Sequence, residues 1–260
     1  MKIGLKLYST NVGLIPEALE LKKRELLEYI ELYVIPGSYE TTIDKWRSLD
    51  IPYVIHAPHS YHGINFAQAD KWETNSKNIY EAQRFADSLC SDIIIVHGGN
   101  NGKFDETLRQ LGLLKEKRIV LENKPKTGIL GEQCVGWSPL EFWSAIDSGI
   151  IHGTVLDFGH ASCAAASMRV DVRGVIQGFM EFNPKIYHLA DGDVLSEKDM
   201  HLNLGKGNFN LAEFIAVIPP DAYLTLETPR KPSSDLKDFV EDVHFLRRIS
   251  IQEKVYGWMD

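Results

Sequence analysis

The sequence lacks the features that mark membrane proteins and disulfide-stabilised secreted proteins. No apolar stretch approaches the roughly 20 residues that cross a bilayer. The first residues, MKIGLKLYSTN, lack the long apolar region and the cleavage site of a signal peptide. The 3 cysteines, Cys90, Cys134 and Cys163, are odd in number and far apart. These absences predict no membrane association and no disulfide framework, and they favour a reducing, cytoplasmic compartment.

Basic residues are also scarce. The chain has 28 Lys and Arg against 36 Asp and Glu, which gives a formal net charge of −8. Taken alone, this charge speaks against a nucleic-acid partner, because phosphate binding usually needs a basic surface. Bound divalent cations would change this balance, because they would attract a polyanion locally while the remaining surface stays acidic.

The order of apolar runs predicts a single (β/α)8 TIM barrel, an α/β fold. The 260 residues fit one large domain, and 44% apolar residues suffice for its core. Short runs rich in Ile, Val, Leu and Tyr predict buried parallel strands at 2–8, 28–35, 52–57, 92–97, 118–123, 153–158, 185–190 and 222–227. Helical periodicity lies between them at 15–25, 40–49, 70–90, 104–116, 138–148, 172–182, 209–217 and 233–248. The spacing of the strands matches repeated βα units.

Local signals support this order. Ser138 before Pro139 and Glu141 resembles a helix N-cap, and Asn208 or Asn210 could cap the helix at 209–217. A doubly wound sheet is the competing architecture. Its glycine-rich phosphate turn is missing after the first strand, where the sequence reads LYSTNVGL.

Histidines and carboxylates recur where the predicted strands end. In a TIM barrel these ends meet at one mouth, where the active site lies. The candidate metal ligands are His56, His97, Glu122, Asp157, His160, His188, Asp199, His201 and Glu227. Imidazole with carboxylate suits Zn²⁺, and also Mn²⁺ or iron. So many ligands exceed one tetrahedral ion and fit three ions that share bridging carboxylates, each with a place left for water.

Each candidate also has a plainer explanation when taken alone. His56 or His97 could be a core histidine with its hydrogen bonds satisfied, and Asp157 a cap. Glu122 and Glu227 could form ion pairs with Lys124 or Arg230. A metal-free barrel that acts as a binding module is therefore a further alternative. It requires that none of these residues converge on a common site at the mouth of the barrel.

Several segments resemble the metal-binding motifs of the endonuclease IV family of apurinic/apyrimidinic endonucleases, within the xylose isomerase-like superfamily. They are HAPHSYHGINF, VLEN, LDFGHA, HLADGD, DMHLNLGKG and LTLETP. The resemblance implies a first zinc on His56, His97 and Glu122. It implies a second on Glu122, Asp157, His188 and Glu227, and a third on His160, Asp199 and His201. It also implies hydrolysis of DNA 5′ to abasic sites, with Glu122 positioning the nucleophile.

The resemblance is weaker in the parts that grip DNA. Lys6 stands where the family usually has a histidine, and the second-strand segment IELYVIPGS lacks the family's arginine loop. Tyr61 could fill the gap left by a flipped nucleotide. Lys6, Lys124 and Arg230 are further candidates for substrate contacts at the mouth. We expect a monomer that binds DNA containing an abasic site.

A sugar isomerase or epimerase of the same superfamily is the alternative function. Such enzymes use one metal held by Glu, Asp, His and Glu, here Glu122, Asp157, His188 and Glu227. Two of the carboxylates, Glu122 and Glu227, would then shuttle a proton next to a carbonyl group. Glu31 in YIELYV also resembles the second strand of that group. The five remaining candidates have no role around one metal, which favours the endonuclease.

Overall fold

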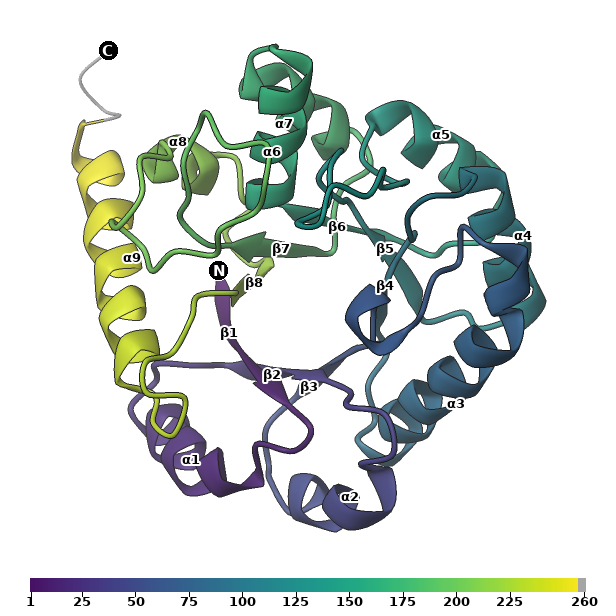
Figure 1. Cartoon of the computed structure of the whole chain (residues 1–260). Coiled ribbons are helices and arrows are strands. Elements are labelled where there is room, and N and C mark those ends of the chain that lie inside the picture. Colours follow the sequence, from purple (N-terminus) through teal and green to yellow (C-terminus); the bar gives the residue numbers. More distant parts are fainter. Residues whose placement is uncertain (257–260) are drawn as a thin grey trace.

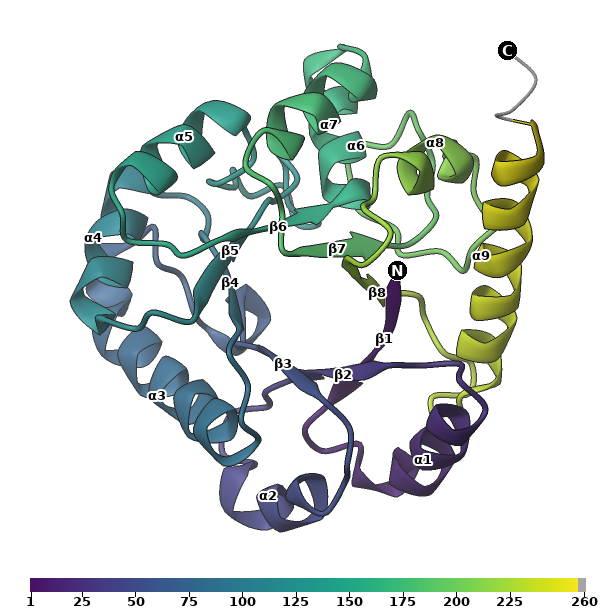
Figure 2. The same cartoon turned by 180° about the vertical axis from the view of Figure 1, so that it is seen from behind.

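The chain forms a closed barrel of eight parallel strands in sequential order, surrounded by helices (Figures 1 and 2). We describe residues 1–256 of it from a computed structural model. The strands are β1 (Lys2–Tyr8), β2 (Tyr29–Tyr33), β3 (Tyr53–His56), β4 (Ile94–His97), β5 (Ile119–Glu122), β6 (Thr154–Asp157), β7 (Ile186–Leu189) and β8 (Tyr223–Leu226). The predicted TIM barrel is therefore confirmed.

Helices cover the outside of the barrel (Figure 1). They are α1 (Ile15–Lys23), α2 (Tyr39–Arg47), α3 (Trp72–Ser88), α4 (Phe104–Leu114), α5 (Pro139–Asp147), α6 (Phe158–Met168), α7 (Val172–Met180), α8 (Leu211–Ala216) and α9 (Lys237–Tyr256). Short 3₁₀ turns lie at Val12–Leu14, Ser60–His62 and Ala69–Lys71. Within residues 1–256, none of the helices combines the length and the apolar character that a membrane span requires.

The barrel interior is a layered core. Side chains alternate between the two faces of a strand, so every second residue points inward. One inward layer is apolar and contains Tyr29, Val54, Ile95, Val120, Val155 and Ile186. The residue two positions later on each of these strands is Glu31, His56, His97, Glu122, Asp157 and His188. The alternation of side chains therefore places a polar layer next to the apolar layer, at the carboxyl ends of the strands.

Gly4 of β1 shows how closely this apolar layer is filled. A Cβ atom at Gly4 would lie 2.2 Å from the ring of Tyr29. The Tyr29 hydroxyl lies 2.6 Å from the hydroxyl of Thr225, which is the register partner of Gly4 on the other side of β1. A larger residue than glycine would therefore displace the ring and break this hydrogen bond.

The cap predictions are confirmed at two helices. Ser138 and Glu141 form a capping box at α5, and the Asn210 side chain accepts from Glu213 N at α8. Asn208 does not cap α8, because its side-chain oxygen accepts the N–H of Val194.

Helix α6 was not predicted, and His160, expected in a loop, lies in its first turn. Asp157 ends β6 and accepts the His160 N–H at 2.7 Å, so strand and helix join with no loop between them.

Candidate metal centre

Six of the candidate ligands lie at the carboxyl end of the barrel because of their position on the strands. His56, His97, Glu122 and Asp157 are the last residues of their strands, His188 lies within β7, and Glu227 follows β8. In the parallel register His97 is the partner of Glu122, and Asp157 is the partner of His188. Since all eight strands run the same way, these side chains meet at one mouth.

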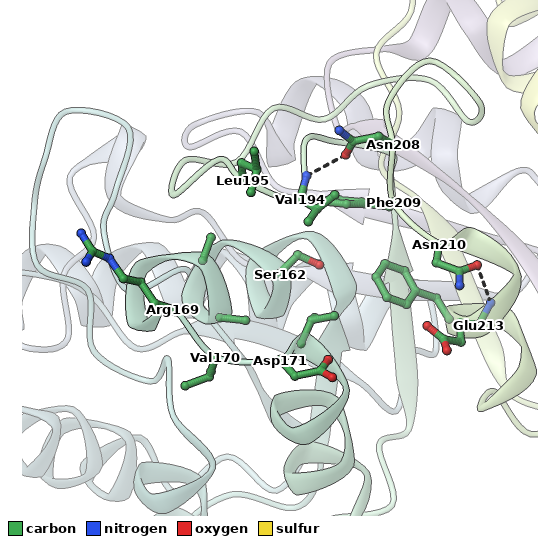
Figure 3. Close-up of a pocket in the computed structure, with 14 residues that line it drawn as sticks. Ser162, Arg169, Val170, Asp171, Val194, Leu195, Asn208, Phe209, Asn210 and Glu213 are labelled. Atoms are coloured by element: carbon green, nitrogen blue, oxygen red, sulfur yellow. Dashed lines mark hydrogen bonds between the residues drawn. The ribbon is translucent and has the colours of Figure 1, made fainter.

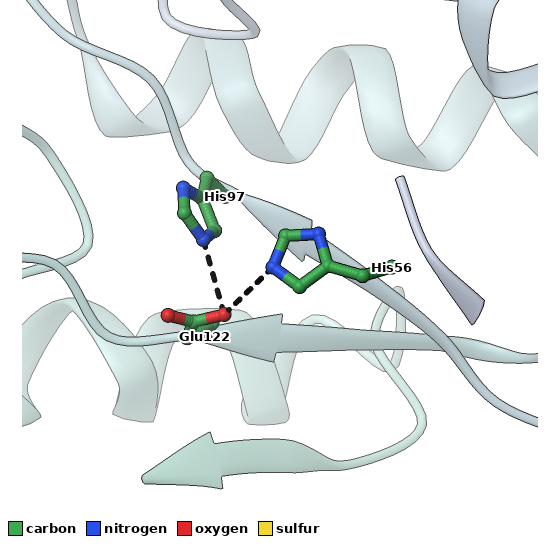
Figure 4. A group of neighbouring side chains, drawn as sticks. All are labelled: His56, His97 and Glu122. Atoms are coloured by element: carbon green, nitrogen blue, oxygen red, sulfur yellow. Dashed lines mark hydrogen bonds and ion pairs between the residues drawn. The ribbon is translucent and has the colours of Figure 1, made fainter. Parts of the chain in front are cut away.

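The first group consists of His56, His97 and Glu122 (Figure 4). The Nε2 atoms of His56 and His97 lie 3.2 and 3.0 Å from the same Glu122 oxygen, Oε2. The His56 Nδ1–H donates to the carbonyl of Ala57 at 2.8 Å, which leaves Nε2 free to face Glu122. Two imidazole nitrogens and a carboxylate oxygen therefore converge in a buried place.

The second group contains Glu122, Asp157, His188 and Glu227, whose ligand atoms all lie within 4.8 Å of one another. His188 Nδ1 lies 2.7 Å from Glu227 Oε1 and 3.5 Å from Glu122 Oε2. Glu122 belongs to both groups, so its carboxylate would be shared between any ions that these groups hold.

The third group combines α6 with the long segment between β7 and α8. It contains His160, Asp199 and His201. His160 Nε2 lies 3.5 Å from Asp199 Oδ2, and His201 Nε2 contacts the same oxygen. Each histidine places Nδ1 2.8 Å from a backbone carbonyl, that of Asn123 for His160 and that of Glu227 for His201. These bonds leave Nε2 free to bind an ion.

Glu31 orients His188 from behind. The His188 Nε2–H donates to Glu31 Oε2 at 2.8 Å, so Nδ1 carries the lone pair that faces the second group. The Thr225 hydroxyl donates to the same oxygen at 2.7 Å. A carboxylate behind a histidine is a common support of metal-binding imidazoles. The sequence did not reveal this contact, because Glu31 and His188 are 157 positions apart. Glu31 was noted there only for its resemblance to the isomerases and epimerases.

Asp191 organises the loop that carries Asp199 and His201. Its side chain is buried and accepts backbone N–H groups from Gly192, Phe209, Gly205 and Gly207 at 2.8, 3.2, 2.9 and 2.9 Å. Its backbone also pairs with Leu202. The sequence pattern did not single out this residue. HLADGD places an aspartate after the seventh strand, but only the structure shows the donors that surround it.

The charges at the mouth are unbalanced in favour of anions. Burial and the nearby carboxylates of Glu227 and Asp199 raise the pKa of Asp157 to about 6, despite the neighbouring His160. Burial lowers the pKa of His97 to about 3, although Glu122 opposes this shift. His97 is thus in the neutral state that binds a metal ion. Nearby carboxylates raise the pKa of His160 and His188 against the effect of burial, so an ion would have to displace their protons.

Buried atoms without hydrogen-bond partners indicate the same need for a cation. His97 Nε2 and His188 Nδ1 are buried and lack a hydrogen bond, and their close polar neighbours are carboxylate oxygens of Glu122 and Glu227. Buried polar atoms usually have partners, so such a cluster suggests a missing ligand. The imidazole and carboxylate donors also suit zinc. The residues of the mouth therefore fit divalent cations.

Lys6 places a positive charge inside this mouth. Its ammonium lies 3.2 Å from Glu31 Oε1 and also contacts Glu227 Oε1. Burial would lower the pKa of Lys6, but Glu227, Glu31 and Glu122 together raise it above its usual value. Lys6 is therefore a charged partner of two carboxylates.

The other candidates for substrate contacts differ in their surroundings. Lys124 Nζ lies 3.3 Å from His97 Nδ1, next to the first group. Tyr61 is 85% exposed in the turn after β3 and lies edge-on to His62. Arg230 follows β8 and donates to the carbonyl of Lys6 at 2.9 Å. Their roles as substrate contacts stay predictions.

A hollow of about 470 Å³ lies away from these groups, between α6, α7 and the segment before α8 (Figure 3). Val194, Leu195 and Phe209 contribute to its mostly apolar lining. None of the nine candidate ligands lines it.

Comparison with known proteins supports the fold and the family. The model of the xylose isomerase-like TIM barrel family matches residues 30–249. The chain belongs to this family. No curated protein sequence matches the chain.

Several solved structures share the fold. Endonuclease IV from Thermus thermophilus is 20% identical, with a TM-score of 0.71, and the match covers 97% of this chain and 100% of that chain. A D-tagatose 3-epimerase-like protein is also 20% identical, with a TM-score of 0.70 and coverage of 98% and 100%. The TTHB071 protein from Thermus thermophilus, studied after soaking with ZnCl2, is 19% identical, with a TM-score of 0.71 and coverage of 97% and 99%. The expected membership of the xylose isomerase-like family is thus confirmed. The solved structures similar to this chain include both an endonuclease and an epimerase-like protein.

Proposed function

We propose that this protein is a metal-dependent hydrolase that cleaves a phosphodiester bond of DNA 5′ to an abasic site. One observation carries the proposal, namely that the nine candidate ligands fall into three adjacent groups, two of which share Glu122. Glu31, His56 and Glu227 form a fourth group that overlaps the first two. Five of the nine residues lie outside the set that a single metal needs: His160, Asp199 and His201 form a separate group, and His56 and His97 form a group together with Glu122. A one-metal isomerase gives these residues no task.

In this proposal the first group, the second group and the third group each hold one divalent cation, with Zn²⁺ preferred and Mn²⁺ or iron as alternatives. Bound ions would supply an acidified water near neutral pH and positive charge for the phosphoryl oxygens. Glu122, placed between two groups, would orient the attacking water in line with the phosphorus atom. The Nδ1–H bonds of His56, His160 and His201 would hold the imidazole rings while substrate binds.

A one-metal sugar isomerase or epimerase is the second candidate. The group of Glu122, Asp157, His188 and Glu227 forms a complete site on its own, and it is supported by Glu31. The similarity to a D-tagatose 3-epimerase-like structure agrees with this candidate as well.

Metal stoichiometry of the purified protein separates these functions. About three ions per chain supports the hydrolase, about one supports the isomerase or epimerase, and none supports a metal-free binding module. The ratio is measured by elemental analysis with zinc, manganese and iron determined together.

A cleavage assay then tests the substrate. We expect incision of a duplex with one tetrahydrofuran abasic analogue and no incision of the same duplex without it. Glu122→Gln should abolish the incision, since its amide cannot bridge two ions or orient water as a carboxylate does. Incision by this variant at the normal rate would refute the role of Glu122.

A further inference from the structure

A second hollow opens directly beside the proposed metal centre. Its volume is about 380 Å³, and Glu227 and His201 of the metal centre form part of its wall. Lys6, Tyr8, Tyr33 and Arg230 form other parts. A ligand in this hollow would therefore reach both the candidate metal ligands and two cationic side chains.

Arg230 is a cation without a matching anion. Its Nη1–H donates to the carbonyl of Lys6, whereas its Nε atom is buried and has no hydrogen-bond partner. Among the side chains described, those of residues 1–250, no carboxylate makes a salt bridge with this guanidinium at 4.0 Å or less. Burial lowers the pKa of Arg230 below its usual value, while Tyr8 and Asp238 oppose the shift. The nearby Asp238 accepts the backbone N–H of Lys231 instead.

A half-buried guanidinium whose Nε atom is buried without a partner favours an anionic ligand. Removing a charge from water is costly unless a partner compensates it. The planar fork of arginine matches the oxygens of a phosphate group, which can accept two parallel hydrogen bonds. Lys6 supports this arrangement, because its contacts with Glu31 and Glu227 neutralise carboxylates that would otherwise repel an anion.

Two tyrosines give the hollow an aromatic wall. Tyr8 is 48% exposed and meets the ring of Tyr33 edge-on, with the ring centroids 5.5 Å apart. The Tyr33 hydroxyl accepts the His59 N–H at 3.1 Å, and its own proton makes no bond within the part of the chain that the structure describes. An aromatic face beside a phosphate site suits a sugar attached to that phosphate.

We propose that Arg230, with Tyr8 and Tyr33, forms a subsite for a phosphate group carried by a pentose, which places the sugar against the metal centre. The inference deepens the proposed function and rests on it for the identity of the ligand. In DNA the phosphate would be one that flanks the scissile bond. In a free sugar phosphate it would be the terminal group.

Binding of phosphate to the protein as purified tests the subsite. The probes are inorganic phosphate and 2-deoxyribose 5-phosphate, with uncharged 2-deoxyribose as the comparison, measured by calorimetry. We expect both phosphates to bind competitively and the uncharged sugar to bind much more weakly. Arg230→Gln should weaken both phosphates about ten-fold or more, since a charge-assisted hydrogen bond is lost.

Two variants keep this test decisive. Arg24→Gln removes an exposed arginine at the end of α1 and should bind phosphate as the unaltered protein does. Arg230→Lys keeps the charge, so it should fold even if Arg230→Gln does not, and it should bind with intermediate affinity because the fork is gone. The inference is overturned if both Arg230→Lys and Arg230→Gln bind phosphate with unchanged affinity. It is also overturned if Arg24→Gln loses as much phosphate affinity as Arg230→Gln does.

The same materials separate this inference from the proposed function. If the phosphates compete with a short abasic duplex for binding, and this competition is lost in Arg230→Gln, the phosphate that occupies the subsite belongs to DNA. Binding of 2-deoxyribose 5-phosphate that depends on Arg230, without incision of abasic DNA, retains the subsite and rejects the endonuclease.

Discussion

Replacement of Asp191 by asparagine tests how the loop between β7 and α8 holds the third group in place. The Asp191 carboxylate accepts two N–H groups on each oxygen, at 2.8 and 3.2 Å on Oδ1 and at 2.9 and 2.9 Å on Oδ2. An asparagine keeps one acceptor oxygen and turns an NH2 group toward the other two donors. Each buried donor left without an acceptor costs about 1–3 kcal/mol, so the variant should lose about 2–6 kcal/mol.

We expect this loss to appear in the loop, where Asp199 and His201 lie, and not in the strands. The third ion must then reorder the loop before it binds. A cost of about 2 kcal/mol weakens its binding about thirty-fold, and a larger cost weakens it further. The ions of the other two groups should keep their affinity, since their ligands end strands, lie within them or, for Glu227, directly follow one. Titration with a chromophoric chelator and elemental analysis measure both effects.

Asp193→Asn is the matched control, because Asp193 lies in the same loop. The Asp193 Oδ1 accepts the N–H of Leu195 at 3.1 Å, and asparagine can keep that acceptor. Ion number and affinity should therefore be unaltered in this control. Three ions bound with normal affinity by Asp191→Asn, or the same loss in both variants, would show that Asp191 does not support the third group.

Two further predictions concern the other parts of the mouth. Glu31→Gln should weaken the ion of the second group about 10–100-fold in chelator competition, because the charge that orients His188 is lost; an unaltered affinity would leave Glu31 without this role. Zn²⁺ at about a hundred times its dissociation constant should raise the unfolding midpoint of the metal-free protein by about 5–10 °C per ion in calorimetry. A midpoint that does not respond to zinc would contradict all three groups.

The barrel was predictable from the sequence because its strands are buried on both faces. Such strands read as continuous apolar runs, and the side-chain period of two then places His56, His97 and Glu122 in one inward layer. The residues of the first two groups were therefore visible as strand ends, whereas His160, Asp199 and His201 of the third group lie in α6 and in the segment before α8. Their role as metal ligands stays a prediction.

Other features depend on contacts that a linear pattern does not contain. Helix α6 follows β6 without a turn, and its residues 158–165 are all buried, so it lacks the polar face that indicates a helix. Asp191 and Glu31 act through hydrogen bonds to atoms that are distant along the chain. The unpaired Nε of Arg230 is likewise a property of the packed barrel and not of the segment LETPR.

The ammonium of Lys6 matters for the protein when no metal ion is bound at the mouth. Metal ions can be withdrawn by a chelator or by scarcity in the cell, whereas a lysine side chain cannot leave. Its pairing with Glu31 and Glu227 is a permanent counter-charge at one side of the mouth. Without ions in the proposed sites, the barrel would therefore keep part of its electrostatic balance, which would favour renewed metal binding by the folded protein over unfolding.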